Sequence, residues 1–452
     1  MPRIETIEIS GWGRYLRRLS TVTRPERLSE AVPPASGHMI VRGQGRSYNS
    51  AAMSQDGLVM LSERLDRILA FDDTTGLLRA EAGATLAKVI DEFIPRGWFP
   101  TVTPGTKFVS LGGCAAADVH GKNHHRDGAF GVHVADLEIV LADGSRRGCS
   151  PQQDGELFWA TVGGMGLTGI ISEISFRLRP IETAYMVVEH RRASDLDDLL
   201  RMLEDETLDD HYSVAWIDCL ARDHSMGRGV LMRGHHAEVA ELRGKVEDPL
   251  RVKARRRFDL PFDLPSWILN SLTGSAFNKF YYWSQRKSQA PFITDYDSFF
   301  YPLDSIGNWN RVYGPRGFVQ YQCVFPPATA RRGLRILLEE LAHSRRASFL
   351  GVLKRFGPEG AGLLSFPIEG YTLSLDLPVT DPKLFSFLDR LDEIVLEHGG
   401  RVYLAKNAHL TPEIFRAMYP RLSEWERLKA KVDPTNRFSS DLSRMLELGT
   451  KT

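Results

Sequence analysis

The sequence has few cysteines, no excess of charge of either sign and no long apolar run. Its 452 residues include only four cysteines, which are widely spaced and form no C-x-x-C pair. They are Cys114, Cys149, Cys219 and Cys323. This spacing argues against a disulfide framework or a thiolate metal site and favours free thiols in a reducing compartment. Basic and acidic residues number 57 each, so we expect no nucleic-acid partner, which would require a basic face.

The sequence also lacks the features of membrane-spanning or secreted chains. No uncharged apolar run reaches the roughly 18 residues that a spanning helix needs. The opening segment, MPRIETIEISGWGRYLRRLS, has no apolar core of the kind found in signal peptides. We therefore expect a protein that is cytoplasmic or peripheral to the inner membrane, and its length suits two domains.

The hydrophobic pattern changes near residue 182. Before it, short strands punctuated by glycine predominate, with an amphipathic helix that starts after Thr85 and stops at Pro95. After it, strands alternate with longer amphipathic helices, and a capped helix begins at Thr411. The expected strands are 38–42, 57–61, a hairpin over 68–82, 134–142, 169–178 and 401–406, and the longer helices are 329–343 and 382–398.

Residues 251–276 differ in character from the regions on either side. A basic run, RVKARRRF, precedes the proline-containing and apolar FDLPFDLPSWILNSLTG. Two interpretations stay open: a mobile surface loop, or a lid over the active site that also touches a membrane. In the second, the basic residues attract anionic headgroups while Trp267, Ile268 and Leu269 enter the interface.

Three glycine-rich stretches are the most informative part of the sequence. They are VRGQGRSYN at 41–49, PGTKFVSLGGCAAADVHG at 104–121 and FWATVGGMGLTGI at 158–170. Glycine directly after an apolar strand permits a turn that exposes successive backbone N–H groups, as a pyrophosphate requires. In the second stretch, small residues let a flat ligand lie against the backbone, and Thr106 and Ser110 can bond to phosphate oxygens. One stretch alone is weak evidence, but three predict a long cradle for a dinucleotide.

A resemblance to a known family extends over nearly the whole chain. The matching blocks are RGQGRSY at 42–48, VHGKNHH at 119–125, ELFWATVGGMGLTGI at 156–170, GNWNRVYGPRGFVQYQ at 307–322, FRAMYPRLSEW at 415–425 and KVDPTNRF at 431–438. With these blocks the sequence resembles the vanillyl-alcohol oxidase family of PCMH-type FAD-binding oxidoreductases. Within that family it is most similar to the group that oxidises decaprenylphosphoryl-β-D-ribose at its 2-position.

The resemblance implies an α+β fold. Residues 1–182 and 400–452 would form a two-part PCMH-type FAD-binding domain, and residues 183–399 an inserted α+β substrate domain built on an antiparallel sheet. Covalent members bond their flavin to a histidine in the first glycine stretch, where this sequence has Arg46, so we expect non-covalent FAD. The implied cofactor contacts are Arg42, Gly43, Gln44, Gly45, Arg46, Ser47, Tyr48, Asn49, Gly105, Thr106, Ser110, Gly112, Gly113, Ala117, His120, Gly121, Gly166, Ile171 and Tyr403.

Flavin oxidation of an alcohol needs a hydride directed at the flavin, a base for the hydroxyl proton and positive charge near the flavin pyrimidine. The resemblance implies substrate alignment or charge stabilisation by Lys406. The implied catalytic residues are Lys406, Tyr48, His120, Lys122 and Gln322, and the implied substrate contacts are Trp216, Gln320, Gln322, Lys354, Phe356, Ser374 and Lys406. Gln320 and Gln322 alternate on an expected strand, so both point to one face.

Two further residue patterns need separate interpretations. The histidines His120, His124, His125 and His133 could suggest a metal site, which we do not favour because no cysteine or carboxylate stands at ligand spacing.

Ser374 stands where mycobacterial members of the family carry a cysteine that nitro-aromatic inhibitors attack. We expect this hydroxyl to preserve turnover and to abolish that covalent trapping.

We therefore expect FAD-dependent oxidation of the 2-hydroxyl of a polyprenyl-phosphoryl ribose to the keto sugar. A short-chain dehydrogenase/reductase partner would then complete an epimerisation towards an arabinose donor. One alternative is an FAD-dependent oxidase of a free sugar, alditol or aldonolactone. A non-enzymatic alternative is a flavin-binding partner subunit, which would have no need of polar pocket residues such as Tyr48, Lys122 and Lys406.

Overall fold

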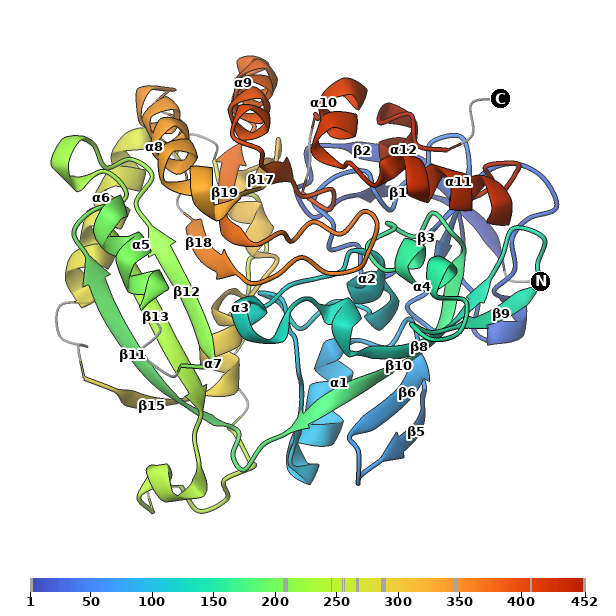
Figure 1. The fold of residues 1–452 in the computed structure, drawn as a ribbon, viewed down its shortest axis with the longest axis horizontal. Coiled ribbons are helices and arrows are strands. Elements are labelled where there is room, and N and C mark those ends of the chain that lie inside the picture. The colour runs from blue at the N-terminus through green and yellow to red at the C-terminus, as the bar shows by residue number, and fades with distance from the viewer. Residues whose placement is uncertain are drawn as a thin grey trace.

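The described strands form sheets of four, six, eight and two strands, with helices packed around them (Figure 1). The structure is a computed structural model. It describes residues 3–205, 210–244, 246–253, 255, 257–265, 268–285, 290–344, 346, 348, 350–406 and 409–449. The fold class is α+β, as the sequence predicts. No helix in these ranges combines the length and apolarity needed to cross a bilayer.

The first two sheets come from the first 180 residues. The four-stranded sheet has the order β1 (Ile4–Ser10), β2 (Arg17–Thr23), β4 (Leu58–Leu61) and β3 (Met39–Arg42). The six-stranded sheet is antiparallel, in the order β5 (Ile68–Asp72), β6 (Leu77–Glu81), β10 (Ile170–Pro180), β8 (Val134–Val140) and β9 (Arg146–Cys149), with β7 (Trp98–Pro100) also on β10. Their helices are α1 (Leu86–Phe93), α2 (Leu111–Ala116), α3 (His124–Asp127) and α4 (Gly155–Thr161).

The eight-stranded sheet forms the other half of the molecule, on the left in Figure 1. Its antiparallel strands run in the order β15 (Phe292–Asp295), β11 (Tyr185–Ala193), β13 (Gly229–His236), β12 (Tyr212–Ile217), β18 (Gly351–Phe356), β19 (Gly370–Pro378), β17 (Phe318–Phe325) and β20 (Arg401–Val402). The helices α5 (Leu196–Glu204), α8 (Pro327–Ser344) and α9 (Lys383–Glu397) pack against it. The two-stranded sheet pairs β14 (Phe258–Asp259) with β16 (Ile306–Gly307).

Alternation along the central strands sends apolar side chains towards the helices and polar ones to the opposite face. On β17, Tyr321 donates a hydrogen bond to Asp392 of α9, and the ring of Phe325 lies against Gly333 of α8. Gln320 and Gln322 therefore point away from the helices. This face, which is free of α5, α8 and α9, carries the candidate site.

The remaining helices complete the fold. The helices α6 (Ser271–Ser284) and α7 (Tyr296–Phe300) lie near the strands β11 to β15, and α10 (Pro412–Met418), α11 (Leu422–Val432) and α12 (Asp441–Met445) lie beside the first sheets (Figure 1). Lys429 of α11 is buried and donates hydrogen bonds to the carbonyls of Leu167 (2.7 Å) and Phe438 (2.9 Å). The end of the chain is thereby held against the third glycine stretch.

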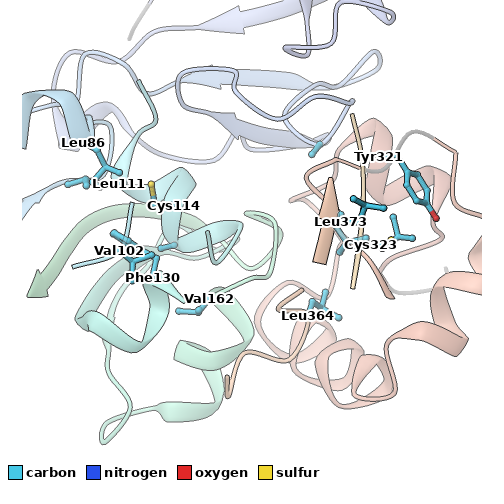
Figure 2. Packing of buried hydrophobic residues seen from close by; sticks show 14 of the residues in the cluster. Leu86, Val102, Leu111, Cys114, Phe130, Val162, Tyr321, Cys323, Leu364 and Leu373 are labelled. Carbon is cyan, nitrogen blue, oxygen red and sulfur yellow. The ribbon is translucent and has the colours of Figure 1, made fainter. Parts of the chain in front are cut away.

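One connected apolar cluster joins the two halves. Figure 2 shows two parts of it, one around Leu111 and Cys114 on α2 and one around Cys323 and Leu373 on β17 and β19. All four cysteines are buried free thiols.

Several elements differ from the sequence-based expectations. The strand expected at 401–406 ends at Val402, because the chain turns back there with the Lys406 N–H donating to the Tyr403 carbonyl (2.9 Å). Parts of the second and third glycine stretches are helical, since α2 and α4 occupy 111–116 and 155–161. The segment 251–276 is not a loop throughout, because α6 begins at Ser271 behind an Asn270 cap.

Candidate active site

A cavity of about 700 Å³ lies between the polar face of the eight-stranded sheet and the glycine-rich loops of the first two sheets. One wall is made of loop backbone and small residues, and the other of strand side chains. Among the described residues that line it, four are basic and none is acidic. The four are Arg46, Lys122, Lys354 and Lys406. The cavity therefore favours an anionic ligand.

The loop wall brings two of the glycine stretches into direct contact. The loop after β3 passes through Gly45, whose φ of +61° is a conformation that glycine adopts without strain. A Cβ on the neighbouring Gly43 would lie 2.0 Å from the Ser110 Oγ. Ser110 itself caps α2 by accepting a hydrogen bond from the Gly113 N–H. This contact leaves no room for a side chain at Gly43.

The loop wall fits the flat, dianionic cofactor FAD. Glycine and alanine line the wall along the loops, and a Cβ built on Gly105 would meet nothing within 4 Å. Above it, the Arg46 guanidinium lies 4.0 Å from the centre of the Trp12 ring, and its Nε has no hydrogen-bond partner among the described residues. A bound pyrophosphate or flavin would have backbone N–H groups and a cation at hand.

The sheet wall holds a buried polar cluster centred on His120. The His120 Nε2 lies 3.0 Å from the Gln322 Nε2, and its Nδ1 lies 3.0 Å from the Lys354 Nζ. Gln322 also donates a hydrogen bond to the Thr372 hydroxyl (3.1 Å). Burial, together with the nearby Lys354, lowers the pKa of His120 well below its usual value. His120 is therefore a neutral imidazole held in a fixed orientation.

A second polar group surrounds the carboxylate of Asp376, which is fully buried on β19. Asp376 accepts hydrogen bonds from Gln320 (2.6 Å) and from the Tyr313 hydroxyl (3.1 Å). The register of β17 on β19 places Gln320 opposite Asp376 and Gln322 opposite Ser374. The Lys406 Nζ lies 3.7 Å from the centre of the Tyr48 ring. The Tyr48 N–H donates to the Ala405 carbonyl (3.0 Å), which ties the first glycine loop to the lysine.

The three half-buried lysines of the cavity have similarly lowered pKa values. Burial lowers the pKa values of Lys122, Lys354 and Lys406 from their ordinary value to about 7. For Lys406 the Asp376 carboxylate opposes this effect, and burial raises the pKa of that carboxyl to about 6. A bound anion would favour the charged lysines, so ligand binding and protonation are coupled here.

Most of the predicted site residues line the cavity. Those that do are Gly43, Gln44, Gly45, Arg46, Ser47, Tyr48, Gly105, Thr106, Ser110, Gly112, Gly113, Ala117, His120, Gly121, Lys122, Gly166, Ile171, Trp216, Gln320, Gln322, Lys354, Ser374, Tyr403 and Lys406. They come from all three glycine stretches, from β10, β12, β17, β18 and β19, and from the turn after β20.

Three predicted contacts do not line the cavity. Arg42 turns away to donate a hydrogen bond to the Ser10 carbonyl (2.7 Å). Asn49 is buried and donates to the Leu404 carbonyl (2.7 Å), which braces the loop that carries Lys406. Phe356 lies behind His120, with its ring edge-on at 4.7 Å between centroids. These side chains support the wall from behind.

Other residues of the site were not predicted from the sequence. Trp12 comes from the loop before β2, and Asp376 from the strand that carries Ser374. Alternation on that strand would have placed Asp376 on the same face as Ser374, so a signal for it existed. The apolar residues that α6 and α7 contribute, such as Phe277 and Phe299, had no comparable signal.

The chain is similar in sequence to two protein families and to several known proteins. Residues 20–150 match the FAD binding domain family, and residues 376–446 match the family described as D-arabinono-1,4-lactone oxidase. The chain is 38% identical over 455 residues to the decaprenylphosphoryl-β-D-ribose oxidase of Mycolicibacterium smegmatis, covering 98% of each protein. An uncharacterized protein of Streptomyces coelicolor is 36% identical over 371 residues, which are 80% of this chain and 100% of that one.

A more distant likeness is confined to part of the chain. Cytokinin dehydrogenase 8 of Oryza sativa is 28% identical over 163 residues, which are 34% of this chain and 31% of that enzyme. The likeness to the mycobacterial oxidase, by contrast, spans both halves of the molecule. The cofactor is FAD, and the chain belongs to the decaprenylphosphoryl-β-D-ribose oxidase family of FAD-dependent oxidoreductases.

Proposed function

We propose that this enzyme oxidises the 2-hydroxyl of a polyprenyl-phosphoryl ribose to the corresponding keto sugar. The observation that carries the proposal is the continuity of the glycine-lined wall with a buried pocket of three lysines and two glutamines. A sugar phosphate ester needs hydroxyl readout and phosphate neutralisation beside the flavin, and this pocket offers both. The 98% coverage by the decaprenylphosphoryl-β-D-ribose oxidase supports the same substrate class.

FAD, when bound, supplies the acceptor for the hydride removed from the sugar carbon. We propose that Lys406 supplies positive charge beside the flavin pyrimidine, because its Nζ lies over the Tyr48 ring at the junction of both walls. Gln320, Gln322 and Ser374 would orient the sugar hydroxyls from one face of the sheet. His120, neutral and held by two neighbours, would accept a hydrogen bond from the reacting hydroxyl when that hydroxyl displaces one of them.

Lys354 and Lys122 are proposed to bind the substrate phosphate. Lys354 is held beside His120, and the ammonium group of Lys122 donates to the Phe299 carbonyl while lying 4.1 Å from the ring centre of Phe299. Arrival of a phosphate would raise the lysine pKa values from about 7 and draw protons onto both groups. Arg46 stands at the position of the flavin-linked histidine of covalent members, so we propose non-covalent FAD.

The proposed domain division follows the sheets except at β20, which belongs to the last segment but pairs with β17 of the eight-stranded sheet. Residues 1–182 and 400–452 would form the FAD-binding domain, and residues 183–399 the substrate domain. The Lys429 contacts to Leu167 and Phe438 support the assignment of the last segment to the FAD side. A short-chain dehydrogenase/reductase is proposed as the partner that reduces the keto sugar towards the arabinose configuration.

We further propose a peripheral membrane contact, located differently from the sequence-based expectation. Trp267 lies outside the described residues. Leu269 is half-buried and packs on the aromatic cluster of Tyr48, Tyr313 and Phe318, so it is not a free interfacial side chain. The exposed large apolar side chains among the described residues of this region are instead Phe258, Phe262, Leu272, Phe277, Phe280 and Trp283. Aromatic side chains of this kind suit the boundary between headgroups and acyl chains.

Oxidation of a free aldonolactone or alditol is the second candidate. It is favoured by the match of residues 376–446 to the D-arabinono-1,4-lactone oxidase family. That match covers only the C-terminal part of the chain, from Asp376 onwards, and includes Lys406 but none of Lys122, Gln322 and Lys354. The cationic residues that would bind a phosphate are therefore unexplained by this candidate.

An anaerobic bleaching assay separates the two candidates. Purified holoenzyme is mixed with farnesylphosphoryl ribose, free ribose, an alditol or an aldonolactone, and the oxidised flavin absorbance is followed. The proposal predicts bleaching by the lipid-linked sugar alone. Bleaching by the free sugars and not by the lipid-linked one would replace it with the second candidate.

A further inference from the structure

The sheet face that lines the cavity changes from polar to apolar across successive strands. On β17 and β19 it presents Gln320, Gln322 and Ser374. On β18 it presents one charged residue, Lys354, beside Val352. On β12, β13, β11 and β15 the lining side chains are Val214, Trp216, Met232, Val188, His190, Phe292 and Thr294. The polar half adjoins the flavin wall, and the apolar half, which we call the apolar limb, extends away from it.

Two lysines and a histidine of the cavity interact electrostatically near the point where the sheet face changes from polar to apolar. Lys354 on β18 is the last charged residue of the sheet face before the apolar limb, and Lys122 lies close enough for the charge of Lys354 to lower its pKa. Lys122 in turn acts on His190 of β11, whose pKa is lowered mainly by burial. His190 Nδ1 lies 2.9 Å from the Gln285 Oε1 at the end of α6. Lys354 thus stands where the apolar limb begins, and Lys122 lies near it, beside Phe299 of α7.

Helices α6 and α7 cover the apolar limb with aromatic rings. Phe277 and Tyr281 of α6 line it one helical turn apart, and the Tyr281 ring meets Trp216 edge-on with 4.8 Å between centroids. Phe299 and Phe300 of α7 complete the cover beside Lys122. No carboxylate lines this limb among the residues described. The limb is therefore an apolar groove partly covered by α6 and α7, and it begins beside Lys354 and Lys122.

We propose that the apolar limb is a binding channel for the first isoprene units of the lipid carrier. The proposal rests on the proposed function, since it takes the substrate to be a polyprenyl-phosphoryl sugar. From β18 to β15 is four strand spacings, or about 19 Å, which accommodates several isoprene units lying across the strands. With the sugar over β17 and β19 and the phosphate at Lys354 and Lys122, the chain leaves under Tyr281 and Phe277. Burial of each unit against this face contributes affinity that a free sugar cannot obtain.

The experiment measures binding of prenyl phosphates that carry no sugar. Dimethylallyl, geranyl and farnesyl phosphate are titrated into the FAD-loaded enzyme, and their dissociation constants are determined by calorimetry. The proposal predicts that affinity rises by about tenfold or more with each added unit, because each brings several buried methylene groups. Equal affinity for all three phosphates would overturn it.

Two substitutions localise the effect. Met232→Glu puts a charge on the half-buried face of β13 within the limb, and it is expected to weaken farnesyl phosphate at least about tenfold while leaving dimethylallyl phosphate nearly unchanged. Val239→Glu, at an exposed site that does not line the cavity, is the matched control and should change neither. Retained FAD absorbance and an unchanged Tm show that both variants are folded. Wild-type affinity of Met232→Glu for farnesyl phosphate would contradict the proposal.

The outcome is independent of whether the enzyme oxidises the proposed sugar. If chain length governs phosphate binding and Met232→Glu abolishes that dependence, the channel stands even when no prenylphosphoryl ribose bleaches the flavin. If farnesylphosphoryl ribose bleaches the flavin but phosphate affinity ignores chain length, the proposed function stands and the channel does not.

Discussion

The two walls of the cavity are built from different parts of the polypeptide. The flavin wall consists of backbone and small residues from loops whose glycines approach other segments, as at Gly43 and Ser110. The substrate wall consists of alternating side chains on one face of an antiparallel sheet. A Cβ added at Gly43 on the first wall meets the Ser110 side chain at once, whereas an exchange of one side chain on the second wall changes one contact among several. We therefore expect the first wall to select the cofactor and the second to select the substrate.

Lys406 lies where the walls meet, so its removal should have the largest effect. Lys406→Met is expected to slow flavin reduction by about 10²–10³-fold, since it deletes the cation proposed to stabilise charge beside the flavin. Stopped-flow absorbance under anaerobic conditions measures the rate. Lys431→Met, an exposed lysine on α11, serves as the control and should react at the wild-type rate. A reduction rate within the wild-type range for Lys406→Met would remove this residue from the proposed mechanism.

The flavin wall is tested by adding a single methyl group. Gly43→Ala forces the Ser110 hydroxyl from its position and weakens the cap of α2, so we expect the dissociation constant of FAD to rise about tenfold. Equilibrium dialysis or flavin fluorescence measures this constant. Gly148→Ala is a suitable control, because a Cβ there meets nothing within 4 Å and the residue lies outside the cavity. Equal FAD affinity in both variants would show that the close approach at Gly43 is unimportant.

The role of the Asp376 carboxylate, which is buried behind the substrate wall, is tested by the pH dependence of flavin reduction. The pKa of Lys406 is lowered to about 7, and the negative charge of Asp376 counteracts that lowering. The cationic lysine is lost as the pH rises through its pKa, so the wild-type reduction rate should fall above about pH 7. Asp376→Asn removes the negative charge, lowers the lysine pKa further and should move this fall to lower pH by about one unit.

The asparagine retains an acceptor for the hydrogen bond from Gln320. If Asp376 had only a structural role, the pH at which the reduction rate falls would therefore not change. A profile that moves to higher pH, or does not move, would contradict the proposed charge coupling between Asp376 and Lys406. Asp376→Glu keeps the charge and should restore the wild-type position of the profile.

The smallest expected change in turnover is at Ser374, whose side chain is one of several on the sheet face. Ser374→Cys should alter the reduction rate by no more than about threefold, a difference of about 0.6 kcal/mol in barrier height. The same variant should acquire a covalent adduct with the nitro-aromatic inhibitors that attack the cysteine of mycobacterial family members. Intact-mass spectrometry detects the adduct. Its formation on the wild-type protein would mean that Ser374 is not the corresponding position.

The two walls also differ in how far the sequence reveals them. Local rules predicted part of the flavin wall, since a turn at glycine directly after strand β3 depends on a few residues, but they did not predict that Ser110 caps α2. Alternation predicted that Gln320 and Gln322 share a face, and the strand β17 confirms it. The pairing of Gln320 with Asp376 depends on the register between strands 56 positions apart in the chain. No local pattern contains that information.

The apolar limb was unpredictable for a related reason. Its lining residues come a few at a time from four strands and two helices, and Trp216 alone among them was a predicted substrate contact. The tight turn after Val402 was also missed, because the β-branched and aromatic residues at 401–404 favour a strand until the first glycine loop binds Ala405. Tertiary contacts decide both features.

The most direct test of the central claim is the isotope dependence of flavin reduction. Farnesylphosphoryl ribose carrying deuterium at C2 is compared with the C3-deuterated and unlabelled compounds in anaerobic stopped-flow measurements. The account predicts slower flavin reduction only with deuterium at C2, because that hydrogen leaves as hydride. Slowing by the C3 label alone, or no bleaching of the flavin by any of the three compounds, would contradict oxidation at the 2-hydroxyl.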